Sequence, residues 1–289
     1  MPSGRIVARL TVLGEPEYVT ACCGGKGDVV IASPGNGSVT LAATGTLHPE
    51  RVLRGFGAPH IVAFSQPADY VDVTDDARGR FDVIGLSTRR VVARVTVGAG
   101  AHHFAASPDG RQIWVALGQS ASRIAILSTV TAPPPGVHGV FENPGRTRLA
   151  GHFDPGYLAH QLMFTPDGRR VWITAADRST VGVFDARTRR RLFGVAAGLP
   201  PQHIAMMDGD AYITSGYGSR IERVDLRNGR VLDVARAPYG SFELDAAGGY
   251  VVTASLLRGT MAIYDASLRR LRVRHVAASA EDVVLSGGK

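Results

Sequence analysis

The 289-residue sequence contains only two cysteines, Cys22 and Cys23, and they are adjacent in the chain. A disulfide framework needs cysteines spread over several loops, so this pair excludes a small fold held together by disulfides. We expect both thiols to be buried in the first inner strand, where cysteine packs as a small apolar residue. A metal or redox role for the pair is the less favoured alternative.

Long apolar runs are also missing. No stretch approaches the roughly 18 apolar residues that a membrane span needs, and the opening segment MPSGRIVARL lacks the apolar centre of a secretory signal. We therefore expect a cytoplasmic protein without a membrane partner. With 45% hydrophobic and 20% charged residues, the chain has enough apolar side chains for a sizeable core.

Lysine is nearly absent, because Lys26 and Lys289 are the only two, yet the net charge is +7 and the isoelectric point is about 9.8. The arginines are scattered as pairs such as Arg89–Arg90 and Arg269–Arg270 rather than gathered with aromatic residues into one stripe. Nucleic acid is therefore not the partner that we expect. An anionic small substrate is compatible with this charge.

Motifs for covalent catalysis and for nucleotide binding are missing as well. The sequence has no usable GxSxG, P-loop, GxGxxG, CxxC or HExxH pattern. It also has no long apolar stripe with the 3.6-residue period of a helix, which favours an all-β fold.

What the sequence does contain is a histidine that returns at one position of a repeated unit. GAPHIVAFS, AGAHHFAAS, YLAHQLMFT and PPQHIAMMD place His60, His102, His160 and His203 at intervals of 42, 58 and 43 residues. This period is typical of a four-stranded propeller blade, about 40 to 45 residues. The same position is filled by Glu17, by Gly240 or its neighbour Tyr239, and by Glu281.

Each unit then continues with the signals of further strands. SPDGRQIWVAL and TPDGRRVWITAA carry an Asp-Gly turn between two apolar runs, which predicts a hairpin, and STVGVFDARTRR and RRLFGVAAG predict the third and fourth strands. The sequence therefore predicts a single domain, residues 1–289, folded as a β-propeller of four-stranded antiparallel blades.

We expect seven positions around the axis, with an abbreviated or irregular last blade, and six blades as the alternative. RIVARLTVLG near the start resembles the fourth strand RRVVARVTVG, whereas only one short strand follows Glu281. The 58-residue interval accommodates an inserted loop at about residues 129–150, rich in proline and glycine, which we expect to cover one face of the ring.

The innermost strand of every blade lines the central channel, so equivalent positions form a layer around the axis. We therefore expect the four repeated histidines to converge, with Glu17 and Glu281 nearby where the ring closes. Imidazoles and carboxylates are a ligand set for a divalent metal ion, whose identity the residues leave open. The alternative is structural: histidine at this position can satisfy the same backbone group in every blade. His103 follows His102 directly, and alternation along a strand predicts that its side chain packs between blades.

The units GAHHFAASPDGRQIWVAL and AHQLMFTPDGRRVWITAA resemble the YVTN-type β-propeller repeat. The entrances PHIV at His60 and QHIA at His203 are also similar to those of the virginiamycin B lyase group. That resemblance implies a seven-bladed propeller with a metal-dependent acid/base site in the channel. The chain departs from the group in its IWVAL and VWITA strands, where the group has a WFTE pattern.

The function that we predict is metal-assisted, lyase-like acid/base chemistry on a small organic molecule. The histidines at 60, 102, 160 and 203 bind the metal or accept a proton, and Glu17 or Glu281 orients the substrate or protonates it. A redox-active metal would make the protein an oxygenase instead. The alternative is a noncatalytic scaffold that binds a protein or ligand through its loop face, near Phe141, Tyr157 or Tyr217.

Overall fold

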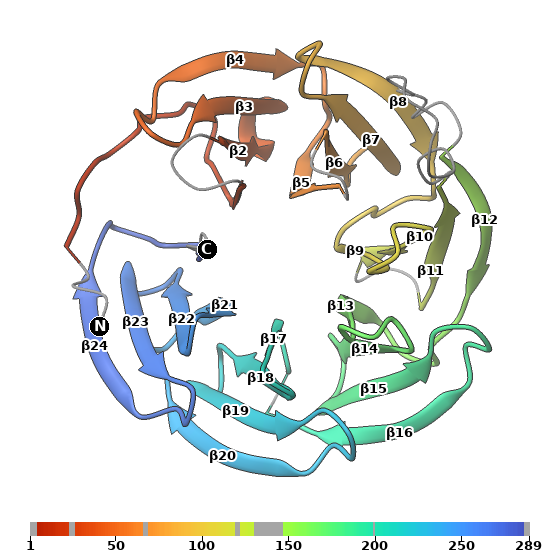
Figure 1. Ribbon diagram of the computed structural model, residues 1–289, viewed down its shortest axis with the longest axis vertical. Coiled ribbons are helices and arrows are strands. Elements are labelled where there is room, and N and C mark those ends of the chain that lie inside the picture. The colour runs from red at the N-terminus through yellow and green to blue at the C-terminus, as the bar shows by residue number, and fades with distance from the viewer. Residues whose placement is uncertain are drawn as a thin grey trace, which may run out of the picture.

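The computed structural model describes residues 5–22, 27–65, 69–118, 122–129, 147–198 and 200–285. The strands form six sheets, each of four strands in antiparallel order. These sheets stand around a central channel as the blades of a propeller, and the first strand of each is the innermost (Figure 1). Among the described residues there is no α-helix, and a short 3-10 turn, η2 (Pro34–Asn36), follows β2.

The first three blades follow one another along the chain. Blade 1 contains β1 (Tyr18–Ala21), β2 (Asp28–Ser33), β3 (Ser38–Ala43) and β4 (Pro49–Arg54). Blade 2 contains β5 (Pro59–Phe64), β6 (Tyr70–Asp75), β7 (Arg80–Gly85) and β8 (Arg90–Thr96). Blade 3 contains β9 (Phe104–Ala106), β10 (Gln112–Ala116), β11 (Ile124–Ser128) and β12 (Arg148–Phe153).

The other three blades repeat this arrangement. Blade 4 contains β13 (Ala159–Phe164), β14 (Arg170–Ala175), β15 (Thr180–Asp185) and β16 (Arg191–Ala196). Blade 5 contains β17 (Ile204–Met207), β18 (Asp210–Ser215), β19 (Arg220–Asp225) and β20 (Val231–Arg236). Blade 6 contains β21 (Ser241–Ala247), β22 (Tyr250–Ser255), β23 (Thr260–Asp265) and β24 (Arg270–His275).

The turn between β9 and β10 shows how the sequence produces a hairpin. Asp109 accepts hydrogen bonds from the Ser107 hydroxyl (2.6 Å) and from the Arg111 amide (3.0 Å). Gly110 follows with a φ of +66°, which glycine adopts without strain. The Ser107 amide then donates to the Gln112 carbonyl at 2.8 Å, so the predicted Asp-Gly turn closes the hairpin.

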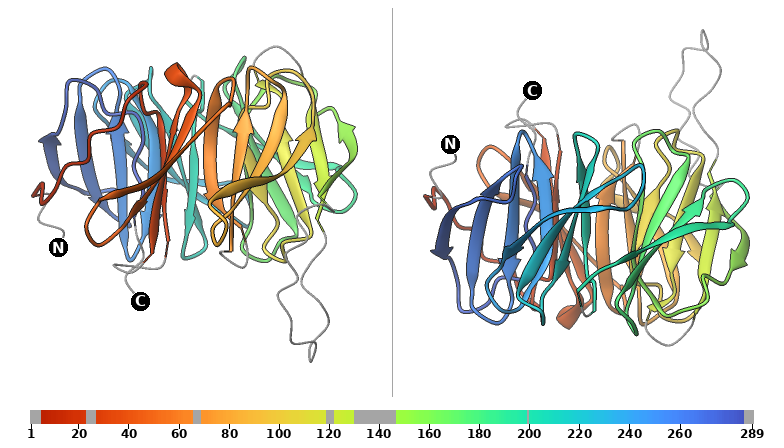
Figure 2. Two further views of the ribbon diagram at one scale, coloured as in Figure 1. Left: turned by 90° about the horizontal axis from the view of Figure 1, so that it is seen from above. Right: turned by 90° about the horizontal axis from the view of Figure 1, so that it is seen from below.

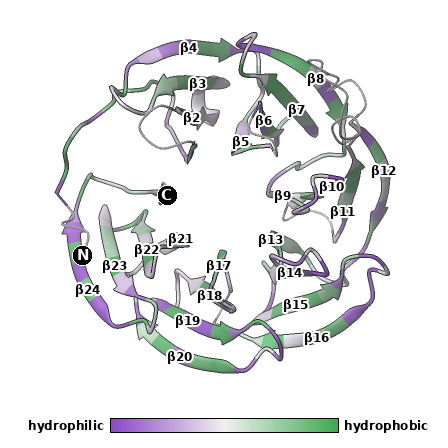
Figure 3. Cartoon of the chain, viewed as in Figure 1, coloured by the Kyte–Doolittle hydropathy of each residue, from purple (hydrophilic) through white to green (hydrophobic). Residues whose placement is uncertain are grey.

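Apolar side chains fill the seams between consecutive blades. Five clusters of buried residues lie at the five seams from blade 1 to blade 6, and one of them packs Trp114 of blade 3 against Leu162 and Phe184 of blade 4. Figure 3 shows apolar stretches on middle strands such as β3 and β7 and hydrophilic stretches on outer strands such as β4 and β24. Each sheet therefore buries its faces only because neighbouring blades cover them.

The prediction of seven positions is wrong, because six four-stranded blades make up the described ring. At the seam between blade 6 and blade 1, the C-terminal segment after β24 links the two by hydrogen bonds. Asp282 accepts one from the Val19 amide (2.8 Å), and Asp245 accepts one from the Leu285 amide (2.7 Å).

The N-terminal segment, residues 5–17, runs along the rim of the ring from the end of β24 to blade 1 (Figure 1). Its Arg9 guanidinium donates to the Val276 carbonyl at 3.2 Å. RIVARLTVLG resembles an outer strand, but none of its residues belongs to a strand here. A strand needs a paired neighbour to satisfy its backbone groups, and a local sequence pattern does not supply one. The likeness to an outer strand was therefore the wrong basis for a seventh blade.

Two further expectations change in detail. The inserted segment was expected at about residues 129–150, but residues 148–150 begin β12 and residues 130–146 lie outside the described part of the chain. Cys22 is half-buried and disulfide-bonded, so the expectation of a free core thiol is wrong for it, while Cys23 lies outside the described residues.

The side views in Figure 2 show the strands running between the two faces of a disc. We call the face at which the innermost strands begin the entry face. Ser128 and Arg148 pair with each other at the opposite end of blade 3, where Ser128 also pairs with Gln112. The residues that flank the inserted segment, Ser128 and Arg148, therefore lie at the face opposite the entry face. No helix of the described chain has the length and apolar character needed to cross a membrane.

Candidate metal centre

Five histidines gather where the innermost strands begin. His60 and His160 lie within β5 and β13, while His102, His103 and His203 directly precede β9 and β17. The ring centroids of His60 and His102 are 3.8 Å apart, those of His102 and His160 are 5.5 Å apart, and those of His160 and His203 are 5.2 Å apart. The structure brings together the four histidines of the repeat and adds His103.

A β-bulge at the start of the innermost strand explains why His103 joins the group. The Ala116 carbonyl accepts from the His102 amide, and the Ala116 amide donates to the His103 carbonyl, so two consecutive histidines oppose one residue of β10. A bulge re-aims a side chain that would otherwise alternate. The His103 ring lies 4.5 Å from that of His160 and 4.7 Å from that of His203, so the expected packing between blades is wrong.

An equivalent bulge in blade 5 shows that the sequence alignment misplaced His203 by one position. Thr214 of β18 is opposed by Gln202 and His203 in the way that Ala116 is opposed by His102 and His103. His203 is therefore equivalent to His103 and not to His102. The sequence alignment missed this one-residue offset because Gln202 occupies the first bulge position in blade 5.

Blade 6 shows the same offset. The register of β21 shifts between Ser241 and Leu244, so Phe242 and Glu243 occupy the two bulge positions. The predicted occupants, Gly240 and Tyr239, precede them. Glu243 is therefore the member of the ring that the sequence did not reveal.

Threonine hydroxyls connect the bulges of adjacent blades. Thr74 Oγ1 accepts from the Ile61 amide (3.1 Å) and donates to the His102 carbonyl (2.6 Å). Thr174 joins the Gln161 amide to the Gln202 carbonyl in the same way, with both distances 2.9 Å. These fully buried hydroxyls hold each bulge against the next blade, so the sheets fix the positions of the histidines.

Two carboxylates face the outer nitrogens of the first two histidines. Asp76 Oδ2 lies 2.9 Å from Nδ1 of His102, and Glu17 Oε2 lies 3.6 Å from Nδ1 of His60. The hydrogen bond with His102 holds the pKa of Asp76 below its usual value, so Asp76 is a carboxylate and accepts the bond. A neutral His102 ring that donates this bond has its proton on Nδ1 and a lone pair on Nε2.

A second group of polar contacts surrounds His203. His203 Nε2 is 2.5 Å from Glu243 Oε1 and 3.3 Å from His160 Nε2. Burial raises the pKa of Glu243 well above its usual value, and the negative charge of Glu281 adds to this effect. Burial also lowers the pKa of His203 to about 3, so Glu243 carries the proton and donates it to a neutral His203.

The predicted residue Glu281 lies at the ring closure, next to Asp282. Burial and the charge of Glu17 raise the pKa of Glu281, and burial and the charge of Glu243 raise the pKa of Asp282 well above its usual value. The Tyr18 ring contacts His60 at a centroid distance of 4.3 Å. The structure thus places Glu17 beside His60, and Glu281 beside the other carboxyl groups that flank the histidines.

Several buried ring nitrogens of this group have no hydrogen-bond partner. They are Nε2 of His60 and both nitrogens of His103, whose residue exposures are 9% and 2%. An unpaired buried polar atom costs about 1–3 kcal/mol. Burial, together with the charges of neighbouring imidazoles, lowers the pKa of His60, His103 and His160 well below the ordinary value. The rings are therefore neutral at neutral pH, which is the form that binds a metal.

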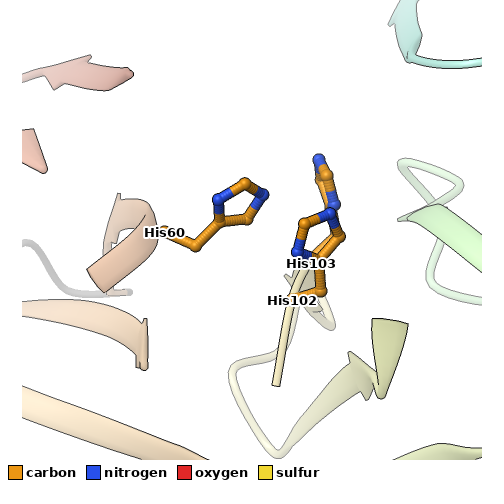
Figure 4. Close-up of side chains that lie close together, drawn as sticks. All are labelled: His60, His102 and His103. Carbon is orange, nitrogen blue, oxygen red and sulfur yellow. The ribbon is translucent and has the colours of Figure 1, made fainter. Parts of the chain in front are cut away.

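The nitrogens form two sets of three whose members lie within 4.8 Å of one another. One set is His60, His102 and His103, and the other is His103, His160 and His203. Figure 4 shows the first set, with His60 approaching from blade 2 and the two consecutive histidines from blade 3. The rings of His60 and His102 are stacked at an interplanar angle of 16°, so they must rotate to direct both lone pairs at one ion.

Comparison with known proteins supports the β-propeller fold but identifies neither a family nor a function. No family model matches the chain, and no curated protein matches it in sequence. Hydrazine synthase of Kuenenia stuttgartiensis is similar in structure, with a TM-score of 0.70 and 16% identity over 92% of this chain and 80% of that chain.

The Cps50 (Swd1) β-propeller domain of Myceliophteria thermophila is also similar, with a TM-score of 0.69 and 13% identity over 92% of this chain and 88% of that chain. One of these proteins is an enzyme, and the other is described only as a propeller domain. At such low identity, both likenesses show a β-propeller fold alone.

Proposed function

We propose that this β-propeller is an enzyme that acts on a small organic molecule by metal-assisted acid/base chemistry at the entry face of its channel. The observation that carries the proposal is the hydrogen bond between Asp76 and Nδ1 of His102, which leaves Nε2 free beside the unpartnered Nε2 of His60. A carboxylate on the outer nitrogen of a ligating histidine fixes its tautomer and increases its basicity. His60, His102 and His103 would hold a divalent ion and leave a position open for substrate.

The first set of histidines is better suited to catalysis than the second. The side chain of His102 is 17% exposed, and those of Asp76 and Glu17 are 38% and 35% exposed. Three protein ligands with an open position are typical of catalytic sites, whereas structural sites are closed. A substrate oxygen can therefore reach an ion at this set, where the ion would stabilise developing negative charge.

Glu17 and Glu281 supply the groups that hold or move a proton. Burial raises the pKa of both carboxyl groups toward the range in which general acid/base catalysis operates. The charge of Glu17 adds to the shift at Glu281, so Glu17 is the better base and Glu281 the better acid. Elimination by this pair is the lyase-like reaction implied by the resemblance to the virginiamycin B lyase group.

Elemental analysis of tag-free protein tests the proposal, with wild type beside His102→Ala. Near-stoichiometric divalent metal in the wild type, and its loss in the variant, would support the site. The metal-loaded protein is then incubated with a mixture of small metabolites, and depletion is followed by mass spectrometry. Depletion of a compound by the wild type alone supports the enzyme, whereas absence of metal from the wild type after loading with divalent ions contradicts it.

Exposed apolar side chains at the entry face favour a second candidate function, a binding scaffold. Tyr217, Tyr239 and Leu257 are 58%, 43% and 48% exposed, and backbone hydrogen bonds from Gly240 and Leu256 bring their turns together. Tyr157, proposed for this role from the sequence, is only 2% exposed, and Phe141 lies outside the described residues.

The scaffold and the enzyme respond differently to substitution. A scaffold that binds through the exposed patch would keep a cross-linked partner in His102→Ala and lose it in Tyr217→Ser. An enzyme would lose turnover in His102→Ala and keep its metal content in Tyr217→Ser.

A further inference from the structure

His103 is the residue that the two sets of histidines share. It belongs to the set with His60 and His102 and to the set with His160 and His203. Its ring centroid lies 5.2 Å from that of His60 and 4.5 Å from that of His160. The catalytic proposal uses only the first set, so the second set is left without a role.

Both ring nitrogens of His103 are buried and without a hydrogen-bond partner. A neutral imidazole always has one N–H donor and one acceptor nitrogen, so this ring leaves both functions unused at 2% exposure. A metal ion on one nitrogen would satisfy only that nitrogen. Two ions, one on each nitrogen, would satisfy the whole ring.

The second set has the geometry of a closed metal site. The Nε2 atoms of His160 and His203 are 3.3 Å apart. An ion at about 2.1 Å from both nitrogens, the usual zinc–imidazole distance, subtends an angle of about 104°, close to tetrahedral. His103 supplies a third nitrogen, and the Glu243 oxygen, 2.5 Å from His203 Nε2, would move away from that nitrogen to become the fourth ligand of a tetrahedral ion.

Carboxyl groups near the histidines would supply negative charge to the bound ions. Five of them surround the histidines: Glu17, Asp76, Glu243, Glu281 and Asp282. Glu17 lies 3.6 Å from His60, Asp76 lies 2.9 Å from His102, and Glu243 lies 2.5 Å from His203, so carboxyl oxygens flank both sets of nitrogens. Divalent cations would place positive charge among these oxygens.

We propose that the channel binds two divalent metal ions bridged by the imidazolate ring of His103, one ion at His60 and His102 and the other at His160, His203 and Glu243. The inference rests on the proposed metal-dependent function and deepens it. As the ions bind, the N–H bond of His103 and the O–H bond of Glu243 break, both protons pass to solvent, and each freed electron pair forms a bond to metal.

Copper(II) titration of the chelator-treated, tag-free protein tests the stoichiometry. We expect two ions per chain in the wild type, one in His60→Gln, one in His160→Gln, and two in His275→Gln, a control on the exposed outer strand β24. Glutamine keeps the size and polarity of the side chain, and thermal unfolding confirms that each variant is folded. One ion in the wild type, lost in both His60→Gln and His160→Gln, would overturn the two-ion proposal and leave the proposed function standing. No ion in the wild type would overturn both.

Electron paramagnetic resonance tests the bridge separately. Two copper(II) ions joined by an imidazolate couple antiferromagnetically, so the wild type loaded with two ions should show far less than one visible spin per copper at low temperature. His103→Gln removes the bridge, so each copper that it retains should give a full signal. Two ions with a full signal in the wild type would show separate sites and overturn the bridge.

Discussion

Asp76 and His102 form a hydrogen bond of 2.9 Å between Oδ2 and Nδ1 across the seam between blade 2 and blade 3. The carboxylate fixes the proton of His102 on Nδ1 and directs Nε2 into the channel. Asp76 follows the second strand of one blade, and His102 opens the first strand of the next blade. The geometry of the site therefore depends on how adjacent blades pack, and not on one blade alone.

Replacing Asp76 by asparagine should weaken metal binding without unfolding the protein. Loss of a carboxylate that orients a ligating histidine typically reduces metal affinity 10- to 100-fold, and we expect an effect of this size. The affinity is measured by competition with a chromogenic chelator. Asp167→Asn is the matched control, because Asp167 also accepts side-chain and backbone hydrogen bonds but lies in a turn at the opposite face. Equal affinities in all three proteins would contradict the role of Asp76.

Convergence of the histidines could be predicted because innermost strands line a propeller channel, and an interval near 42 residues places one side chain in each blade. The roles of His103 and Glu243 could not be predicted, because a β-bulge adds one residue and shifts every alignment that assumes simple alternation. The sequence does contain a signal for Asp76, because a second acidic residue directly follows the end of β6. In contrast, Gly216 follows β18 and Leu256 follows β22. Only the packing of two blades shows that this acid reaches His102.

The blade count could not be read from local patterns. The N-terminal segment has the apolar spacing of an outer strand, but a strand forms only when a neighbouring strand accepts its hydrogen bonds. A resemblance of ten residues carries no information about that neighbour. The six complete blades, in contrast, each show several strand signals in order, and the pairing within every one follows from them.

Thr74→Val should destabilise the fold and loosen His102. The substitution keeps the shape of the side chain but removes a hydroxyl that bonds the Ile61 amide and the His102 carbonyl across a seam. Each of the two buried groups left unpaired costs about 1–3 kcal/mol, so we expect a loss of about 2–6 kcal/mol in unfolding by urea. Thr188→Val, at an exposed turn, is the control and should change stability by less than about 1 kcal/mol. A similar small change in Thr74→Val would show that the hydroxyl does not hold the seam.

Tyr157→Phe should reduce stability and leave metal and partner binding unchanged. The Tyr157 hydroxyl donates to the Ile173 carbonyl (2.9 Å) and accepts from the Gly182 amide (3.2 Å), and the residue is buried between blade 3 and blade 4. Loss of the hydroxyl removes two buried hydrogen bonds, so we expect a cost of about 1–3 kcal/mol in denaturant unfolding. If Tyr157→Phe binds a partner less well while its free energy of unfolding is unchanged, Tyr157 has the loop-face binding role suggested by the sequence.

His203 should make the metal-free protein sensitive to acid. Its pKa is about 3 in the folded protein and 6.5 in the unfolded chain, so the unfolded chain binds the extra proton first as the pH falls. The contribution of His203 to the free energy of unfolding is complete above about pH 6.5. It decreases as the pH falls toward 3, and about 2 kcal/mol is lost at pH 5. Urea unfolding of chelator-treated protein at pH 7 and pH 5 measures this loss. His203→Gln should lose less stability over the same interval, and an identical loss in both proteins would assign the acid sensitivity to other groups.

Asp72 should make the folded protein less stable as the pH rises, which is opposite to the effect of His203. It is buried within β6, and burial raises its pKa from 3.8 to about 7. The folded protein therefore holds a proton that the unfolded chain releases, so the stability associated with Asp72 is complete below pH 3.8 and is lost as the pH rises through 7. About three pKa units correspond to about 4 kcal/mol. Asp72→Asn cannot ionise, so its stability relative to the wild type should increase by up to this amount between pH 4 and pH 8 in urea unfolding. The exposed Asp208→Asn variant should follow the wild type at every pH. If Asp72→Asn also follows the wild type, Asp72 is ionised in the folded protein at neutral pH.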